Sequence, residues 1–468
     1  MLKLELVQKT LKTEVVGARV ESFDFVSTDS RTVGERALFV ALRGPTHNGH
    51  DFIGAAFDRG ATGAVIERAF IDRAKVMLGR KIQKFTLVPV PDTLQALGDL
   101  ASAHRAQFGV RIAAVTGSNG KTTTKEMIAA ILSEAGTVLK TEGNFNNLIG
   151  LPLTVFGIGP AHNFAVLEMG MSQPGEVRRL AQIARPDAAI VTNVHPAHLE
   201  GMGTVESIAD EKWQIYEGLG VNGTAVVNMD DPVLAARASG LKEKKLTFGS
   251  APKCDVRLSA VESRGTEGQR LVLNVKGRRV EAHIPHLGRH NALNATGAAA
   301  AAVALGAEPE CIPAGLESVE IVPRRLQHEV VGGVHVLNDA YNANPKSMEG
   351  AIDTLCSLAA GARSFAVLGD MLELGPRSAE LHEDLGRVIA EKKVAVLVVL
   401  GTESANTVKG AIAAGMDPGA CFKAVDAPDA AWLLRKRARP GDWVLIKGSR
   451  GMKMELVFEQ FKSSFAGA

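Results

Sequence analysis

Short apolar runs alternate with stretches of helical periodicity along most of the chain. Residues 37–42 and 63–67 have the character of buried strands around a helix over 52–59, and 91–108 has the spacing of an amphipathic helix. The apolar run 111–115 is followed by small residues and then, from Lys121, by a helical pattern. The same criteria predict strands over 164–169, 188–194, 224–228, 270–275, 279–284, 334–338, 364–368, 394–400 and 443–446, a helix over 205–219 and an alanine-rich helix opened by 288–294.

This alternation predicts an α/β fold with more than one domain. At roughly 150 residues per domain, a chain of 468 residues corresponds to about three domains. We expect a small N-terminal α/β domain over 1–90, a central doubly wound domain over 91–322 and a C-terminal domain with a second doubly wound sheet over 323–468.

Composition narrows the classes of partner. The 53 basic and 51 acidic residues leave a net charge of +2, so no charge asymmetry argues for nucleic acid or a membrane surface as a partner. The cysteines at 254, 311, 356 and 421 are too scattered for a zinc knuckle, so we expect core thiols in a reducing compartment. The N-terminus lacks the apolar stretch of a signal peptide, and no run approaches the ~20 apolar residues of a membrane span. We therefore expect a soluble cytoplasmic protein.

The segment RIAAVTGSNGKTTTKEMIAA, residues 111–130, reads as strand, loop and helix. Glycines let such a loop wrap a phosphate, and the helix N-terminus adds partial positive charge. Lys121 would reach the outer phosphates and the Thr122 hydroxyl would bind Mg²⁺. The alternative is a glycine-rich turn with a solvated lysine. The common P-loop has a glycine where this chain has Val115, so GSNGKTT is a shorter variant. The predicted nucleotide-binding residues here are Gly117, Ser118, Asn119, Gly120, Lys121, Thr122 and Thr123.

Three residues further along are candidates for the metal site. Glu168 ends a predicted strand, where an acidic residue beside a phosphate loop is the expected Mg²⁺ partner, although it could instead cap a helix. His198 is a candidate second ligand or a structural histidine. Lys212, as an ordinary cation, would be repelled by Mg²⁺, so it is either remote from the metal or chemically altered.

Other polar segments are less specific. The loops 27–31 and 43–51 flank a predicted strand and are turns or ligand loops. His290 and Asn294 could read a purine edge or cap a helix. The clusters 339–347, 369–375 and 447–451 follow strands of the third domain and suggest a shared cleft. Gly218, Gly220 and Gly223 fit GxGxxG but precede a strand instead of following one, so we interpret them as a helix cap and turn.

Several of these motifs together resemble the Mur ligase family: GSNGKTTTKE, EMG at 168–170, HLE at 198–200, HNALN at 290–294 and DAYNANP at 339–345. The resemblance extends over all three domains, in the same order. The resemblance implies a UDP-binding first domain, an ATPase second domain and a Rossmann-like third domain, with ATP and Mg²⁺ as cofactors. His195 departs from the pattern, because relatives often carry glycine there.

Matching motif to motif carries roles onto individual residues. Lys212 corresponds to a lysine that is carbamylated in relatives, which would turn a cation into a carboxylate. The implied catalytic residues are Lys121, Lys212, His198 and Arg324, and the implied metal ligands are Thr122, Glu168, His198 and Lys212. The implied nucleotide contacts outside the loop are His290, Asn294, Arg324 and Asp339. The implied substrate contacts are Ser27, Asp29, Ser30, Arg31, Asn48, His50, Asn144, Asn147, Tyr341, Asn342 and Asn344.

The C-terminal motifs DAYNANP, LGDMLELG and KGSR are most similar to members that join D-alanyl-D-alanine to UDP-N-acetylmuramoyl-tripeptide. This implies an ATP-dependent, ADP-forming amide ligase that works through an acyl phosphate in peptidoglycan synthesis, and hence in cell shape and division, as a cytoplasmic monomer. The third residue of the acceptor, meso-diaminopimelate or lysine, stays open. The alternatives are another amide ligase of the family, a small-molecule P-loop kinase and a nucleotide-gated binding protein.

Overall fold

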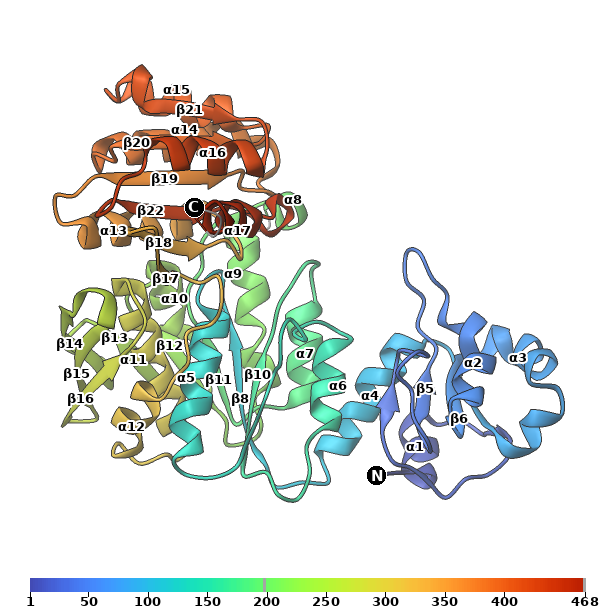
Figure 1. Cartoon of the computed structure of the whole chain (residues 1–468). Coiled ribbons are helices and arrows are strands. Elements are labelled where there is room, and N and C mark those ends of the chain that lie inside the picture. Colours follow the sequence, from blue (N-terminus) through green and yellow to red (C-terminus); the bar gives the residue numbers. More distant parts are fainter. Residues whose placement is uncertain (197–198, 466–468) are drawn as a thin grey trace.

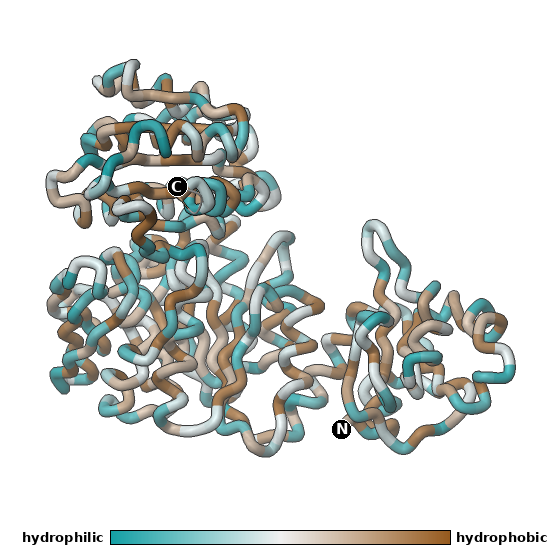
Figure 2. The backbone as a smooth tube through the Cα atoms, viewed as in Figure 1, coloured by the Kyte–Doolittle hydropathy of each residue, from teal (hydrophilic) through white to brown (hydrophobic). Residues whose placement is uncertain are grey.

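The computed structural model describes residues 1–196 and 199–465 and folds them into three successive α/β units (Figure 1). Each unit has its own sheet, and the apolar segments run through these sheets while polar segments lie in the connections (Figure 2). This confirms the predicted fold class, although the domain boundaries near residues 90 and 322 stay a prediction. No helix among the described residues has both the length and the apolar character needed to cross a membrane.

The N-terminal unit has a mostly parallel sheet in the order β2-β7-β6-β5-β4, with β2 antiparallel to β7. Phe39 and Phe85 are fully buried in its core. Its strands are β1 (Leu2–Lys3), β2 (Val16–Gly17), β3 (Ser22–Phe23), β4 (Val26–Ser27), β5 (Leu38–Val40), β6 (Gly63–Glu67) and β7 (Thr86–Val90), and its helices are α1 (Leu4–Leu11), α2 (Ile53–Asp58) and α3 (Ile71–Leu78).

Helix α4 (Thr93–Arg105) joins this unit to the next. The Asp92 carboxylate accepts hydrogen bonds from the N–H groups of Leu94 and Gln95 and so caps the helix, as short polar side chains do. Buried Leu97 and Leu100 lie on the face that meets the N-terminal core, and α4 also packs against α6 (Gly150–Phe156) and α7 (Glu176–Ala184) of the central unit. The N-terminal unit therefore lies beside the central unit (Figure 1).

The central sheet has the order β16-β15-β14-β13-β12-β11-β8-β10-β9, parallel from β9 to β14 and antiparallel through the last two strands. Its strands are β8 (Arg111–Thr116), β9 (Val138–Lys140), β10 (Phe164–Glu168), β11 (Ala188–Val191), β12 (Thr224–Asn228), β13 (Lys244–Gly249), β14 (Val256–Ser263), β15 (Gln269–Val275) and β16 (Arg278–Ile284). Its helices are α5 (Lys121–Ser133), α6 (Gly150–Phe156), α7 (Glu176–Ala184), α8 (Leu199–Met202), α9 (Val205–Trp213), α10 (Pro232–Arg237), α11 (Arg289–Ala304) and α12 (Cys311–Glu317).

The C-terminal sheet has the order β17-β18-β22-β19-β20-β21, parallel except for edge strand β17. It sits over the edge of the central sheet where β8 and β11 end (Figure 1). Its strands are β17 (Gln327–Val331), β18 (Val334–Asp339), β19 (Ser364–Gly369), β20 (Val396–Leu400), β21 (Cys421–Ala424) and β22 (Trp443–Lys447), and its helices are α13 (Pro345–Ala359), α14 (Ser378–Glu391), α15 (Ser404–Ala413), α16 (Ala427–Arg437) and α17 (Glu455–Ser463).

Several predicted elements are shorter in the structure than the sequence suggested, and for two of them the surrounding contacts give the reason. The helix predicted over 205–219 ends at Trp213, because the fully buried Tyr216 turns inward and donates from its hydroxyl to the carbonyl of Val226, 2.9 Å away. The strand predicted over 188–194 ends at Val191, because the next residues bend toward the phosphate loop. Cys254 is buried, and Cys311, Cys356 and Cys421 are partly buried and pack against the hydrophobic cores, so the expectation of core thiols is confirmed in part.

Candidate active site

A cavity of about 600 Å³ lies between the central and C-terminal units. Parallel strands β8, β10 and β11 bring their carboxyl ends to its floor, and the loop after β18 together with Lys447 at the end of β22 forms its opposite wall. The predicted site residues that line it are Ser118, Asn119, Gly120, Lys121, Thr122, Thr123, Asn144, Asn147, Glu168, His290, Asn294, Asp339, Tyr341, Asn342 and Asn344. His198 lies outside the described residues.

The phosphate loop depends on glycine at both ends. Gly117 has φ +150° and Gly120 has φ +78°. A Cβ added at Gly117 would lie 1.8 Å from Thr192 Oγ1, and one at Gly120 would lie 2.5 Å from Asn294 Oδ1. Only glycine fits these close approaches without moving the neighbouring side chains.

The segment after β11 holds the loop in place. The N–H groups of Ser118 and Asn119 donate to the carbonyl and side-chain oxygens of Asn193, at 3.0 and 2.9 Å. Ser118 Oγ donates to the carbonyl of His195 and accepts from its N–H, both at 2.9 Å. His195 therefore supports the loop through its backbone, while its half-buried ring faces the cavity and has a pKa lowered by that burial.

Lys121 is folded back on its own loop. Its Nζ donates to the carbonyl of Gly117 at 2.8 Å, and burial lowers the pKa of the ammonium although the carboxylate of Glu168 opposes this effect. A bound phosphate would give the ammonium a charged acceptor in place of a carbonyl oxygen, which makes a stronger hydrogen bond.

Thr122, Glu168 and Arg325 form the polar centre of the site. Thr122 Oγ1 donates to Glu168 Oε2 at 2.8 Å and accepts from Arg325 Nη2 at 2.9 Å. Asn146 Nδ2 donates to the other carboxylate oxygen of Glu168, also at 2.8 Å. The Glu168 carboxylate, which is 3 % exposed, is therefore bonded to side chains and not to the N–H groups of a helix that it could have capped. The hydroxyl and carboxylate are hard oxygen ligands of the kind that Mg²⁺ takes, so the residues present fit the ion.

Lys212 lies beneath this centre and does not line the cavity. It is 1 % exposed, and the acceptor nearest its Nζ is the thioether of Met171 at 3.5 Å, which is a weak one. Desolvation first, and the charge of Lys121 second, hold the pKa of Lys212 well below its usual value. An ammonium in such surroundings loses its proton readily.

The start of α11 forms a side wall of the cavity. Asn294 Nδ2 donates to Asn291 Oδ1 at 3.0 Å, and Asn291 Nδ2 donates to the carbonyl of Leu287 at 2.7 Å. Neither side chain caps α11, because Gly288 stands at the cap position and no side-chain cap bond is present there. The Asn294 amide is instead held against Gly120 of the phosphate loop.

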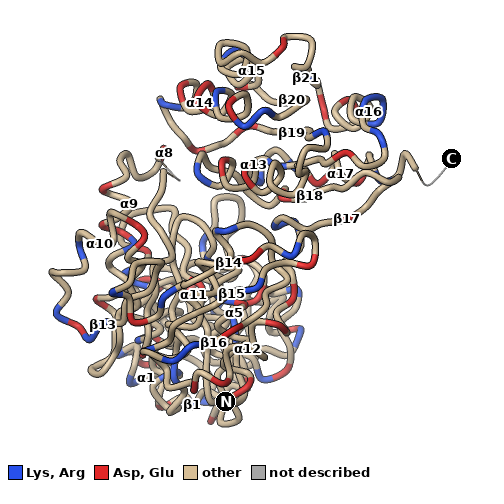
Figure 3. The backbone as a smooth tube through the Cα atoms, turned by 90° about the vertical axis from the view of Figure 1, so that its left-hand side faces the viewer, with Lys and Arg blue, Asp and Glu red and all other residues tan. Residues whose placement is uncertain are grey.

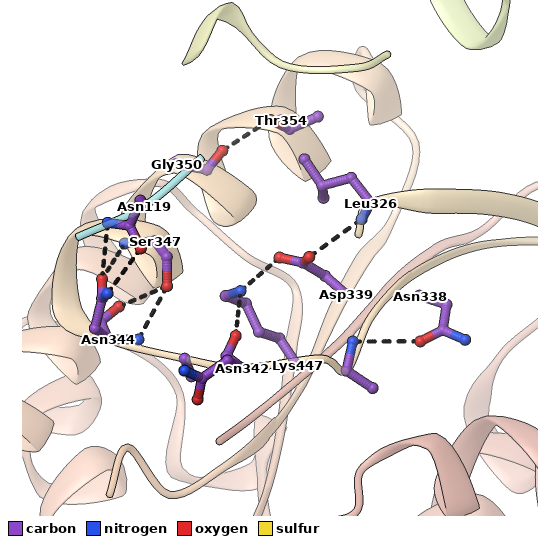
Figure 4. A network of polar contacts seen from close by, with 12 residues as sticks. Asn119, Leu326, Asn338, Asp339, Asn342, Asn344, Ser347, Gly350, Thr354 and Lys447 are labelled. Carbon is purple, nitrogen blue, oxygen red and sulfur yellow. Dashed lines mark hydrogen bonds and ion pairs between the residues drawn. The ribbon is translucent and has the colours of Figure 1, made fainter. Parts of the chain in front are cut away.

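The opposite wall carries a polar network from the C-terminal unit (Figure 4). The buried Lys447 Nζ donates to Asp339 Oδ2 at 2.6 Å and to the carbonyl of Asn342 at 2.9 Å. The side-chain amides of Asn119 and Asn344 donate to each other's oxygens at 3.2 and 2.7 Å, which ties the phosphate loop to the N-terminus of α13. Of the three predicted polar clusters, 369–375 does not reach the cavity.

Arg324 does not reach the cavity either. It has φ +63°, and its Nη1 donates to Glu455 Oε1 at 2.9 Å. It lines a separate cavity of about 200 Å³. The next residue, Arg325, enters the main cavity and places its guanidinium 4.1 Å from the ring centroid of Tyr341. Arg325 therefore enters the main cavity, whereas the left-handed backbone at Arg324 turns its side chain toward α17, and the role implied for Arg324 stays a prediction.

The residues predicted to bind uridine lie in the N-terminal unit, away from the cavity. These residues are Ser27, Asp29, Ser30, Arg31, Asn48 and His50, and none of them lines the main cavity. Asp29 Oδ2 pairs with Arg31 Nη2 at 2.8 Å, and hydrogen bonds from Arg31 lower the pKa of Asp29 to about 2. In His50, Nδ1 lies 2.7 Å from Asn48 Oδ1, and Nε2 accepts from the N–H of Glu67 at 2.9 Å. Both ring nitrogens of His50 therefore serve the local fold.

Sequence reasoning missed several residues that contact the site. Arg325, Asn146 and Lys447 line the cavity through side chains, and Asn193 orders the phosphate loop. Asn146 and Lys447 stand in segments that the motifs had already marked. Arg325 could not be distinguished from its neighbour by composition, because the choice between them is made by the backbone.

Comparison with known proteins covers nearly the whole chain. Residues 22–105 match the Mur ligase family catalytic domain, residues 115–302 the Mur ligase middle domain and residues 324–450 the Mur ligase glutamate ligase domain. The UDP-N-acetylmuramoyl-tripeptide--D-alanyl-D-alanine ligase of Bacillus subtilis (strain 168) is 37% identical over 440 residues, which are 94% of this chain and 93% of that protein.

Solved structures agree with these matches. The crystal structure I of MurF from Acinetobacter baumannii aligns with a TM-score of 0.89 at 29% identity and covers 99% of both chains. MurF ligase from Thermotoga maritima, solved in complex with ADP, aligns with a TM-score of 0.83 at 30% identity and covers 95% of this chain and 98% of its own. A phosphate loop facing polar side chains from a third unit, together with these full-length matches, establishes that the chain belongs to the Mur ligase family.

Proposed function

We propose that this Mur ligase is an ATP-dependent, ADP-forming enzyme that joins D-alanyl-D-alanine to UDP-N-acetylmuramoyl-tripeptide. The observation that carries the proposal is the single cavity in which Lys121, the Thr122–Glu168 pair and Arg325 meet. The similar protein of Bacillus subtilis is named for this reaction, and the similar protein of Thermotoga maritima holds ADP.

The cations around the cavity suit activation of a carboxylate. A carboxylate resists attack by an amine, because its charge repels the nucleophile and oxide is a poor leaving group. Transfer of the ATP γ-phosphoryl group to the tripeptide carboxylate forms an acyl phosphate and ADP. Lys121 and Arg325 would offset the negative charge that spreads over the transferred group. The dipeptide amine then attacks the acyl carbon, phosphate leaves, the amine loses a proton and an amide remains.

Thr122 and Glu168 would hold Mg²⁺ next to the phosphates, where the ion neutralises phosphate charge. Lys212 fits the same site only as a neutral or modified group. Its buried amine, with a lowered pKa, can attack CO₂ to form a carbamate with release of a proton. That carbamate would supply a further oxygen ligand, whereas an ammonium would repel the ion. The carbon signal of a ¹³CO₂-labelled carbamate, absent in Lys212→Met, tests this assignment.

The remaining proposed roles are distributed over the three units. His290 and Asn294 would face the adenine, Asp339 the nucleotide from the third unit, and Asn144, Asn147, Tyr341, Asn342 and Asn344 the muramoyl peptide. The loops at 27–31 and 43–51 would hold the uridine. We further propose that the enzyme works as a cytoplasmic monomer in peptidoglycan synthesis, and so acts on cell shape and division.

The test is release of phosphate from ATP in the presence of UDP-N-acetylmuramoyl-tripeptide, with and without D-alanyl-D-alanine, followed by the mass of the product. Release that depends on the dipeptide, with a pentapeptide product, supports the proposal. Acceptors with meso-diaminopimelate and with lysine are compared in parallel. A phosphorylated product formed without an amine would point to a kinase, and nucleotide binding without turnover to a binding protein.

Lys121→Ala tests the role of the phosphate loop. The variant loses the charge that reaches the outer phosphates, so we expect acyl-phosphate formation to be abolished. Trapping of the acyl phosphate as a hydroxamate measures that step without the dipeptide. Near-normal turnover by the variant would contradict the assignment.

A further inference from the structure

The exposed face at the C-terminal end of α16 combines one aromatic side chain with several cations. Trp432 is 55% exposed, and Arg435 and Lys436 follow it at helical spacings of three and four residues. Arg439 lies two residues beyond the last residue of the helix and is also exposed. Together these four residues are called the α16 basic face. Figure 3 shows the basic segments of α16 on the outside of the C-terminal unit.

The cations of this face are not neutralised by acidic side chains. Residues 430–441, AAWLLRKRARPG, contain no Asp or Glu. Among the described residues, no ion pair involves Arg435, Lys436 or Arg439. The nearest acidic groups on the chain are already engaged: Asp429 accepts from the N–H of Val425 at 3.0 Å, and Asp442 is buried beside Arg363. Helix α17, which packs against α16, adds one exposed carboxylate, Glu459.

Part of this charge has a local explanation. Cations in the last turn of a helix complement its dipole, and Arg437 lies over the ring of Phe422 at 3.7 Å. That explanation does not account for Arg439, which lies beyond the helix, or for an exposed tryptophan. Lys436 Nζ lies 5.3 Å from the centre of the Trp432 ring, so an exposed aromatic ring and a cation lie next to each other on this face, while the Arg435 guanidinium lies 4.1 Å from the ring centre of Phe465.

We propose that the α16 basic face docks the enzyme onto an anionic lipid bilayer. Tryptophan favours the interface between water and lipid, and Lys and Arg are attracted to acidic headgroups. The net charge of the whole chain is only +2, so the attraction is local to this face. The face is a helix surface that lines neither of the two cavities described above, and one aromatic ring without a groove suits a flat bilayer better than a nucleic acid strand.

The predicted binding is weak and sensitive to salt. Each Lys or Arg close to an acidic bilayer raises the partition coefficient about fivefold. Neutralising two cations, in Lys436→Gln/Arg439→Gln, should therefore lower partitioning about 25-fold. The matched control is Lys242→Gln/Lys244→Gln, which removes the same charge from exposed positions at the start of β13.

The experiment is co-sedimentation of the full-length protein with phosphatidylcholine vesicles, with and without phosphatidylglycerol, at low and high salt. We expect binding only with phosphatidylglycerol, its loss in the α16 double variant and its retention in the control, with ligase turnover unchanged in both variants. Trp432 emission should shift to the blue on binding, since Trp432 is more exposed than Trp213 and Trp443. Absence of binding, equal loss in both double variants, or tighter binding to single-stranded DNA in the same buffer would overturn the proposal.

Discussion

Neighbouring Arg324 and Arg325 offer a matched pair of substitutions that tests the site directly. Both become glutamine, so each variant loses one positive charge and keeps a side chain of intermediate length. Only Arg325 lies in the cavity, with Nη2 2.9 Å from Thr122 Oγ1, whereas Arg324 pairs with Glu455 on the outside. The two substituted positions are adjacent in the chain, but only Arg325 is placed to act in the proposed mechanism.

The two substitutions should differ clearly in how much activity they remove. Two unit charges about 4 Å apart interact by about 4 kcal/mol at an effective dielectric constant of about 20, and removal of one preorganised donor from a transition state costs about 10²–10³ in kcat. Arg325→Gln should fall in that range. The Arg324 side chain is 43% exposed, and such ion pairs are worth about 0–1 kcal/mol, so Arg324→Gln should lose at most about fivefold.

The assay is kcat/KM for ATP at saturating acceptor and dipeptide, with the acyl-phosphate step trapped separately by hydroxylamine. Arg325→Gln should be defective in both measurements, because the lost charge acts on phosphoryl transfer. A large loss in Arg324→Gln together with near-normal activity in Arg325→Gln would refute the geometry and restore the residue that sequence reasoning had chosen.

Three further experiments test two supports of the site, Gly120 and the Asn119–Asn344 pair, and the buried His286 between β16 and α11. Gly120→Ala should weaken binding of a non-hydrolysable ATP analogue at least about tenfold in calorimetry, because its Cβ would lie 2.5 Å from Asn294 Oδ1 at φ +78°; unchanged affinity would refute the role of that contact. Alanine at Asn119, at Asn344 and at both should show a coupling of about 1–2 kcal/mol in denaturant unfolding, and strict additivity would show that the amide pair is not formed. Burial lowers the pKa of His286 to about 4, so the unfolded chain binds the extra proton and stability falls as the pH drops below about 6.5. His286→Gln should remove about 2 kcal/mol of the stability difference between about pH 7 and about pH 5 in urea unfolding, and equal slopes for both proteins would contradict this.

The parts of the site that sequence reasoning predicted well are those made by one continuous segment. Strand β8, the phosphate loop and α5 are adjacent in the chain, and their local signals, glycines between an apolar run and a helical pattern, determine them almost alone. The position of Glu168 could be predicted for a similar reason, because parallel strands place their carboxyl ends at the same edge of a sheet. The sequence left open whether Lys212 is remote from the metal or chemically altered, and its burial beside Met171 depends on packing that no pattern encodes.

The contacts that join the units could not be read from the sequence. Asn119 and Asn344 are separated by 225 positions, and either residue alone is ordinary loop composition. The choice between Arg324 and Arg325 is made by a short left-handed stretch, with φ +63° at Arg324 and φ +49° at Leu326, which the Asp339 carboxylate stabilises by accepting the N–H of Leu326 at 3.1 Å. Lys447 in turn holds that carboxylate. The arginine that enters the main cavity is therefore selected by a polar network of the third unit, and a substitution such as Lys447→Met should misplace Arg325 without touching the phosphate loop.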